Sequence, residues 1–335
     1  MHKSSPFLET LTIHLGPKHD ALGLSPVQEL ICLHRLHEVV ISEIQGLSAF
    51  RTIVTKPNLT NLDVTIHRRD VNGPRVALGR AVSVHDLREL TVRSSDTSVV
   101  SDLLKLVRFY ALKTAVFHLG SPEGSQDLEV VSTDISTFLG LFYNSVSDSD
   151  LQSFELSAST QAFQPAGPSE PVALRELLAP ILPIRGLHSF SLLTSGTLTT
   201  SATVMARLDD TDICVLSTAW PKLERLALNR RNFTPESSIS LNALHHLYTH
   251  GTYLQALSIP RLRWPIIGVH CIPSPLDCLQ AHPLRRISMQ DSGLEPGLSD
   301  EGAEAMARYL LELFPSLSLW RNAERNAYAF LRSDE

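Results

Sequence analysis

The sequence predicts an α/β solenoid, in which short parallel strands line the concave face and helices cover the convex face. Three observations lead to this prediction. A short pattern that contains leucine recurs along the chain, the residues between its apolar positions are mostly polar, and stretches with helical periodicity lie between most copies. A doubly wound parallel sheet would instead show continuous apolar strands, because both of its faces are buried.

The recurring pattern is L-x-x-Φ-x-Φ, where Φ is an apolar residue. Its ten copies predict strands near 8–14, 36–42, 59–65, 87–93, 112–118, 151–157, 187–193, 223–229, 254–260 and 284–290. Successive copies start 23 to 39 residues apart, whereas leucine-rich repeats usually span about 20–29 residues. We therefore expect an irregular leucine-rich-repeat solenoid with the shape of a horseshoe.

The third, fifth and seventh residues of each copy play no part in defining the pattern, so their polarity is an independent test. In a strand they lie on the face opposite to the fourth and sixth residues. They are predominantly polar, as in Glu89, Thr91 and Arg93 of the fourth copy. This alternation indicates strands with one buried face and one face in water.

Helical segments are predicted between the strands, at 26–33, 99–112, 133–146, 172–182, 210–219, 237–249 and 299–314. Several start at residues that favour helix N-termini, such as Ser25 and Ser299, and prolines such as Pro221 stop others. A last helix is predicted at 322–331, and we expect 299–331 to cap the stack.

Four insertions rich in proline, glycine or serine interrupt the pattern, at 68–84, 119–128, 157–172 and 260–283. The strand pattern resumes after each of them, so they are interpreted as loops and not as domain linkers. Residues 1–335 are therefore predicted to form a single repeat domain.

Composition narrows the range of partners. The formal net charge of −6 and the pI near 6.2 disfavour nucleic acid and anionic membrane as partners. The four cysteines are scattered, and the chain begins with neither a signal peptide nor an apolar run long enough to span a membrane. We expect an intracellular protein, cytoplasmic or nuclear.

Motifs for catalysis or cofactor binding are missing from the sequence. It has no phosphate-binding glycine loop and no H-E-x-x-H, and Ser299 fits a helix N-cap better than a nucleophile. His270, Cys271, Cys278 and His282 are spaced too widely for a zinc module and are interpreted as separate loop residues. We expect a protein that is not an enzyme and that has no catalytic residues, no cofactor and no metal.

Two histidines and two tryptophans have structural or surface interpretations. His14 and His118 fall on the polar strand face and are interpreted as binding-surface residues. Trp220 comes before a proline at a helix end and is predicted to be in the core. Trp264 lies in an insertion and is expected to be partly buried, with an exposed anchor for a partner as the alternative.

The segments 208–228 (LDDTDICVLSTAWPKLERLAL), 241–259 and 284–317 share a recognisable unit of helix and leucine-containing strand, with Trp-Pro before the strand in the first segment and Phe-Pro before the last strand in the third. The unit resembles the C-terminal repeats of fungal, particularly basidiomycete, F-box/leucine-rich-repeat proteins, over about residues 140–320. The resemblance implies substrate recognition for a cullin-type ubiquitin ligase.

The chain departs from that family in two respects. The asparagine usual at the ninth repeat position is replaced by Ser159, Ser195, Arg231, Leu262 and Ser292. No F-box is evident, because the segment 24–36 (LSPVQELICLHRL) lies between two predicted strands and is interpreted as a repeat helix. A ligase adaptor is therefore expected to bind only if an F-box is encoded upstream.

The sequence thus predicts a protein-interaction module whose concave face binds a protein substrate or ligand. The residues predicted to make this contact are Glu155, Ser191, Arg225, Asn229, Arg286 and Gln290. The alternative is a leucine-rich-repeat scaffold or ligand-sensing region that is unrelated to ubiquitination.

Overall fold

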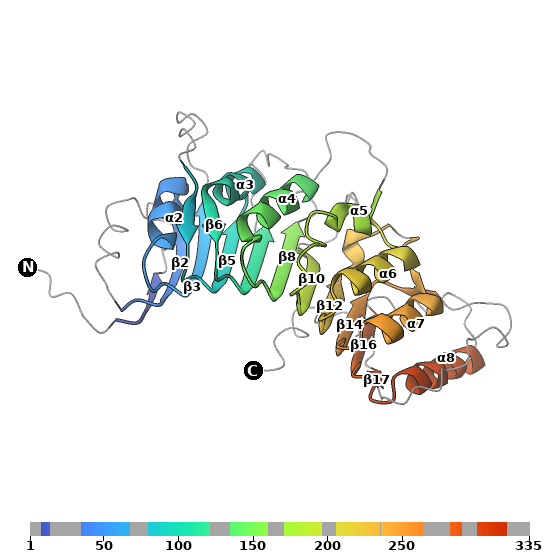
Figure 1. The fold of residues 1–335 in the computed structure, drawn as a ribbon. Helices are drawn as coiled ribbons and strands as arrows, with labels where there is room; N and C mark the ends of the chain where they lie inside the picture. Colours follow the sequence, from blue (N-terminus) through green and yellow to red (C-terminus); the bar gives the residue numbers. More distant parts are fainter. Residues whose placement is uncertain are drawn as a thin grey trace, which may run out of the picture. The chain divides into compact units, whose positions relative to one another are not determined.

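The computed structural model of the chain describes residues 8–13, 35–67, 80–120, 135–159, 171–195, 206–234, 236–263, 282–289 and 300–319. The described structure divides into two compact α/β units. The first comprises Met1–Ser169 and Ser195–Thr203, and the second comprises Glu170–Thr194 and Val204–Glu335. Each unit combines a parallel sheet with helices (Figure 1).

The first unit contains a parallel sheet whose strands are adjacent in chain order. They are β1 (Thr10–Ile13), β2 (Glu38–Gln45), β3 (Asn61–His67), β5 (Glu89–Ser94), β7 (Thr114–Leu119) and β8 (Ser153–Ser159). The helices α2 (Gly46–Val54), α3 (Thr97–Leu106) and α4 (Ile135–Val146) cover one face of these strands (Figure 1). A separate parallel pair is formed by β4 (Val82–Val84) and β6 (Val107–Phe109).

The core of the first unit lies between this sheet and its helices. In β2, β3, β5, β7 and β8 the fourth and sixth residues of the pattern are buried, for example Leu90 and Val92 in β5. Phe117 of β7 contacts Phe138 and Phe142 of α4 edge-on, with ring centroids 5.3 and 5.4 Å apart. Because side chains alternate along a strand, the polar residues point away from the helices.

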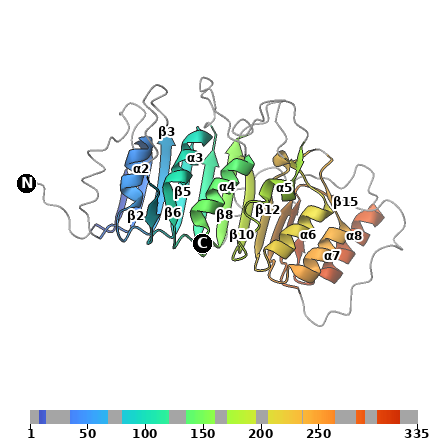
Figure 2. The same cartoon turned by 45° about the horizontal axis from the view of Figure 1, so that its top comes forward.

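The second unit repeats this construction. Its parallel strands are, in order, β10 (Ser189–Ser195), β12 (Arg225–Leu228), β14 (Ala256–Ile259), β16 (Arg286–Met289) and β17 (Ser318–Leu319). Its helices are α5 (Leu174–Leu178), α6 (Asp210–Ala219), α7 (Leu241–His250) and α8 (Asp300–Leu313), and α6, α7 and α8 lie side by side (Figure 2).

The second unit also contains four strands of two residues each. Three of them precede α5, α6 and α7, and the fourth follows β14. β9 (Val172–Ala173) pairs with β11 (Ala206–Arg207), and β13 (Ile239–Ser240) pairs with β15 (Leu262–Arg263), all in parallel. These pairs bring the N-termini of neighbouring helices close together. The polar contacts at those N-termini are described below.

Each of the ten stretches predicted as strands contains a strand that begins two residues after its first leucine. The described leucines from Leu36 onward are buried at that position, so the leucine packs into the core before the chain joins the sheet. An eleventh strand, β17, follows α8 where the sequence shows no full copy of the pattern.

The predicted helices need three corrections. The helix expected at 99–112 ends at Leu106, because Val107–Phe109 pairs with β4 instead. The helix expected at 172–182 is reduced to α5, because Val172 and Ala173 pair with β11. Helix α2 was missed, whereas α6 has the predicted bounds of 210–219. The helices predicted at 26–33 and 322–331 lie outside the described residues.

Trp220 confirms its predicted core position. It is 0% exposed, its backbone N–H donates to the Leu216 carbonyl at the end of α6, and its ring lies 4.9 Å from that of Phe190. Pro221 follows it, so the helix stops there and the chain turns into β12.

Asn232 follows the ninth position of its copy of the pattern, Arg231, by one residue. Asn232 is fully buried, and its Nδ2 donates to the carbonyl of Leu192 at 2.8 Å. The short 3₁₀ helix Arg230–Asn232 shifts it to this place. Among the described helices, none has the length and apolar character needed to cross a membrane.

Candidate functional site

The candidate site is the sheet face of the first unit that points away from its helices. Three rows of side chains cross it in register. The first row is Thr10, Glu38, Asn61, Glu89, Thr114 and Ser153, the second is Thr12, Val40, Asp63, Thr91, Val116 and Glu155, and the third is Thr65, Arg93, His118 and Ser157. We call these three rows the polar face.

Two contacts between side chains join β3 to β5 on the polar face. The Arg93 guanidinium forms an ion pair with Asp63, and Nδ2 of Asn61 donates to Oε2 of Glu89 at 3.1 Å. The Arg93 and Asp63 side chains are 44% and 30% exposed, so the pair contributes about 0–1 kcal/mol to stability. Its main effect is to fix the positions of the two charges.

His118 and Glu155 are both kept closer to neutrality by their surroundings. Burial lowers the pKa of His118, and the neighbouring Arg93 charge lowers it further, while Asp63 acts in the opposite direction. Burial raises the pKa of Glu155 on the next strand. The polar face therefore has little positive charge near neutral pH apart from Arg93.

Ser157 lies beside His118 in the third row. Its side chain is 0% exposed, and its hydroxyl has no hydrogen-bond partner. His118 therefore does not accept a proton from this hydroxyl, and the two residues do not form a nucleophile–base pair in this structure. The arrangement offers hydrogen-bonding and charged groups for recognition.

The residues predicted for protein binding are divided between the two units. Glu155 lies on the polar face of the first unit, and the remaining described residues belong to the second. Arg225 and Arg286 occupy the same register position on β12 and β16, on either side of Ala256. Gln290 lies outside the described residues.

Two of these predicted residues do not offer an exposed side chain. Ser191 is 2% exposed, and Asn229 is 9% exposed. Oδ1 of Asn229 accepts the backbone N–H of Arg231 at 3.0 Å and so caps the short 3₁₀ helix that follows β12. In the sequence Asn229 continues the strand pattern, but the strand ends at Leu228.

Asp63 and Arg93 were not among the predicted contact residues. The sequence offered one signal for them as contact residues, since both occupy positions of consecutive copies that are usually polar. The ion pair between them depends on the diagonal offset between β3 and β5, where Arg93 pairs with Thr65 and Asp63 with Thr91. The repeat pattern alone does not reveal that offset.

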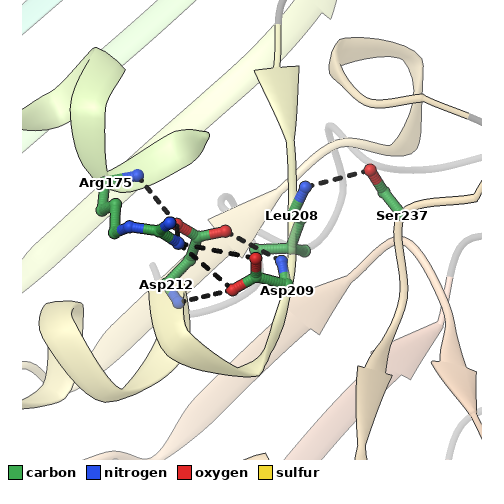
Figure 3. Close-up of polar contacts among 5 residues, drawn as sticks. All are labelled: Arg175, Leu208, Asp209, Asp212 and Ser237. Carbon is green, nitrogen blue, oxygen red and sulfur yellow. Dashed lines mark hydrogen bonds and ion pairs between the residues drawn. The ribbon is translucent and has the colours of Figure 1, made fainter. Parts of the chain in front are cut away.

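A second polar cluster lies at the starts of α5 and α6 in the second unit (Figure 3). Oδ1 of Asp212 accepts the backbone N–H of Arg175 at 3.0 Å and its Nη1 at 3.1 Å. Asp209 and Asp212 also cap each other's backbone N–H groups in a capping box. Nearby, the N–H of Leu208 donates to Oγ of Ser237 at 3.0 Å.

The two carboxylates of this cluster differ in their acidity. Burial raises the pKa of Asp212, although the N–H groups of Arg175 and Asp209 oppose it. Burial also acts to raise the pKa of Asp209, but the Asp212 N–H and the charge of Arg175 outweigh it, and the pKa is lowered. Asp212 is 0% exposed, so Arg175 supplies the charge that compensates a buried acid.

The same kind of contact links α6 to α7. Oδ1 of Asp210 accepts the backbone N–H of Ser240 at 2.7 Å, its Oδ2 accepts the Ser240 hydroxyl, and Ser240 is the N-cap of α7. We call the contacts of Arg175, Asp209, Asp210, Asp212 and Ser240 the helix-start ladder. Each carboxylate in it accepts hydrogen bonds from backbone N–H groups of the protein, which indicates a structural role.

The candidate metal residues are only partly within the described residues. Nδ1 of His282 accepts the N–H of Leu284 at 3.1 Å, and its Nε2 lies 3.0 Å from the carbonyl of Gly251. Both ring nitrogens are thus engaged. His270, Cys271 and Cys278 lie outside the described residues, and within those residues no group of three or more His, Cys, Asp or Glu could hold a metal ion.

Acid should destabilise the second unit through His282. Burial lowers its pKa, although the Gly251 and Leu247 carbonyls oppose this, so the folded chain binds the proton more weakly than the unfolded chain does. The contribution of His282 is therefore complete above about pH 6.5 and is lost as the pH falls towards the lowered value. Urea unfolding between pH 5 and 7.5 measures it.

The matched control is His282→Asn, which should lose this part of the pH dependence. Equal slopes of unfolding free energy against pH in the two proteins would assign the effect to another group, such as His118.

No protein-family model matches this chain, and no curated protein is significantly similar to it.

Proposed function

We propose that this chain is a protein-interaction module that binds another protein through the polar face of its first unit. One observation carries the proposal: three registered rows of mostly polar side chains lie on the sheet face that the helices leave uncovered. A sheet face of this kind presents side chains at about 4.8 Å spacing across several strands, which suits recognition of an extended surface.

In this proposal the repeats of both units belong to one irregular leucine-rich-repeat solenoid, with the strands on its concave side. Three features support it: the recurring strand and helix, the Asn232 contact to the preceding copy, and a buried leucine two residues before the strands β2, β3, β5, β7, β8, β10, β12, β14 and β16. The horseshoe form would place the polar face on the inside of the arc.

We propose further that the bound protein is a substrate of a cullin-type ubiquitin ligase. The support is the resemblance of residues 208–317 to fungal F-box repeats, together with the observed order of α6, Trp220, Pro221 and β12. This role requires an F-box from outside the part of the chain that carries the resemblance. The chain alone should not bind the ligase adaptor stoichiometrically in a pull-down.

Blocking the polar face should abolish partner binding. Thr91 lies in the middle of the second row, and Thr91→Trp places a large ring there without changing any charge. Partners are first identified by cross-linking of the wild-type polar face and mass spectrometry. We expect the amount of these partners that the variant captures to fall at least tenfold. Thermal unfolding checks that the variant is folded.

The control for this experiment is Lys105→Glu. Lys105 is exposed on α3, on the helical side of the unit, where it pairs with Asp102 at 2.8 Å. This variant should retain the partners. If Thr91→Trp and Lys105→Glu capture the same partners in equal amounts, the polar face is not the binding surface.

A further inference from the structure

The polar face carries more negative than positive charge. Its carboxylates are Glu38, Asp63, Glu89 and Glu155, and among its described residues the only permanent cation is Arg93, which pairs with Asp63. Asn61, a neutral donor, contacts Glu89. Glu38, Glu89 and Glu155 thus remain without a balancing cation among the described residues of this face.

Aliphatic surface lies directly beside these carboxylates. Val40 stands next to Asp63 in the second row, and Val116 stands next to Glu155. Both valines are partly exposed. Lysine and arginine bury their methylene stems on apolar surface while their charged ends reach an acid. A carboxylate beside exposed valine surface therefore suits a long basic side chain better than it suits water or a small cation.

At the β8 end of the polar face, one buried polar group has no hydrogen-bond partner. The Ser157 hydroxyl is buried without a partner, which is unfavourable for the folded chain. Glu155 lies two residues earlier on the same side of the strand, roughly 7 Å away along the backbone. A guanidinium has five N–H donors in a fixed plane and can serve two acceptors at once.

We propose that the polar face binds an arginine-containing basic segment of a partner protein, with one arginine held at Glu155 and Ser157 and further cations at Glu89 and Glu38. This inference rests on the proposed function and names the chemistry of the partner. Burial of Glu155, which raises its pKa, is then offset in the complex by the arginine charge.

The spacing of the carboxylates sets the spacing of the cations. Glu38 and Glu89 occupy the same row on strands separated by β3, so their backbones lie roughly 10 Å apart. A peptide in the polyproline II conformation, which rises about 3.1 Å per residue with three residues per turn, places every third side chain on the same face at about 9 Å spacing. A segment with a basic residue at every third position matches the polar face.

The test uses fluorescence anisotropy of the full chain with a labelled peptide that has arginine at every third position and glycine and serine between. The variant Glu38→Gln/Glu89→Gln/Glu155→Gln should weaken binding at least tenfold. The control Glu236→Gln/Glu304→Gln/Glu312→Gln removes three exposed carboxylates of the second unit and the same net charge. It should change the affinity less than twofold.

Ser157→Ala provides a second measurement. The wild-type hydroxyl is unsatisfied, so its removal should leave the melting temperature unchanged or slightly higher, yet weaken the peptide by about three- to tenfold. A merely structural Ser157 would leave the peptide affinity unchanged. The combination of an intact fold and a weaker complex identifies a binding group.

Other outcomes overturn the inference. Equal weakening by the two triple variants would show nonspecific attraction to a negative chain, and tighter binding of a matched glutamate peptide would reverse the assigned partner. If the arginine peptide does not bind but Thr91→Trp still removes captured partners, the basic segment is wrong and the binding function stands. If neither effect is found, both proposals fail.

Discussion

Replacing Trp220 by alanine should lower the free energy of unfolding of the second unit by about 3–5 kcal/mol. Trp220 is 0% exposed, packs against Phe190 and ends α6 just before the chain enters β12. Its removal leaves a large cavity between the helix and the sheet, and the surrounding repeats cannot close it without shifting both. Urea unfolding followed by circular dichroism gives the change.

Trp220→Phe is the matched control for this substitution. The indole Nε1 has no hydrogen-bond partner, so its loss removes an unsatisfied buried donor, while phenylalanine keeps most of the contact with Phe190. We expect a cost of at most about 2 kcal/mol. A loss below about 1 kcal/mol for Trp220→Ala itself would contradict the core position.

Removing the Arg175 side chain should cost the second unit about 2–3 kcal/mol. The loss of a partner from a buried ion pair costs about 3–5 kcal/mol, and the cost is smaller here because the Arg175 side chain is 30% exposed. In Arg175→Met, Asp212 remains buried and keeps its backbone donors but loses the compensating charge. Chemical unfolding at pH 7 measures the loss.

A double substitution distinguishes this charge effect from lost packing. Arg175→Met/Asp212→Asn removes both charges and keeps a side-chain oxygen for one of the two backbone N–H donors of Asp212. Because it leaves no buried charge without a partner, it should be more stable than Arg175→Met alone. The pKa of Asp212 is already raised, and a raised carboxyl pKa favours the folded state at low pH and opposes it as the pH rises through that pKa. The Arg175→Met deficit should therefore shrink near pH 4. A deficit that does not change with pH would assign the effect to packing.

The strands could be predicted from the sequence because apolar residues in each copy mark one face of the strand and polar residues mark the other. Leucine and the apolar fourth and sixth residues mark the core, and residues such as Glu89 and Arg93 mark the other face. The pattern did not show where the strand starts, since the first leucine packs in the turn before it. Strands of two residues, such as β9 and β13, are too short to show any periodicity.

The helices were harder to place where local preference and long-range pairing compete. Val107–Phe109 continues the apolar periodicity of α3, yet it joins β4, a strand that comes before that helix in the chain. Helix α2 begins at Gly46, a residue type with low helix propensity, and ends in the β-branched pair Ile53 and Val54. By contrast, the aspartates at 209, 210 and 212 mark the start of α6, and Pro221 marks its end.

The candidate site could be predicted only as a type of surface. Glu155 is a polar residue of a predicted strand, and it lies on the polar face. The ion pair of Asp63 with Arg93 and the unsatisfied hydroxyl of Ser157 depend on register and on burial, which no single repeat contains. Ser191 and Asn229 show the reverse error, because a polar residue type does not guarantee an exposed side chain.

The helix-start ladder has a consequence for how this chain can change in length. Asp212 completes the start of α5, and Asp210 completes the start of α7, so both of these helix starts depend on the copy that contains α6. Excision of that copy would leave the backbone N–H groups at both helix starts without their carboxylate acceptors, and Arg175 without its acidic partners. Extra residues between the copies leave these contacts intact. The second unit should therefore accept longer connections between its copies but not the deletion of an internal one.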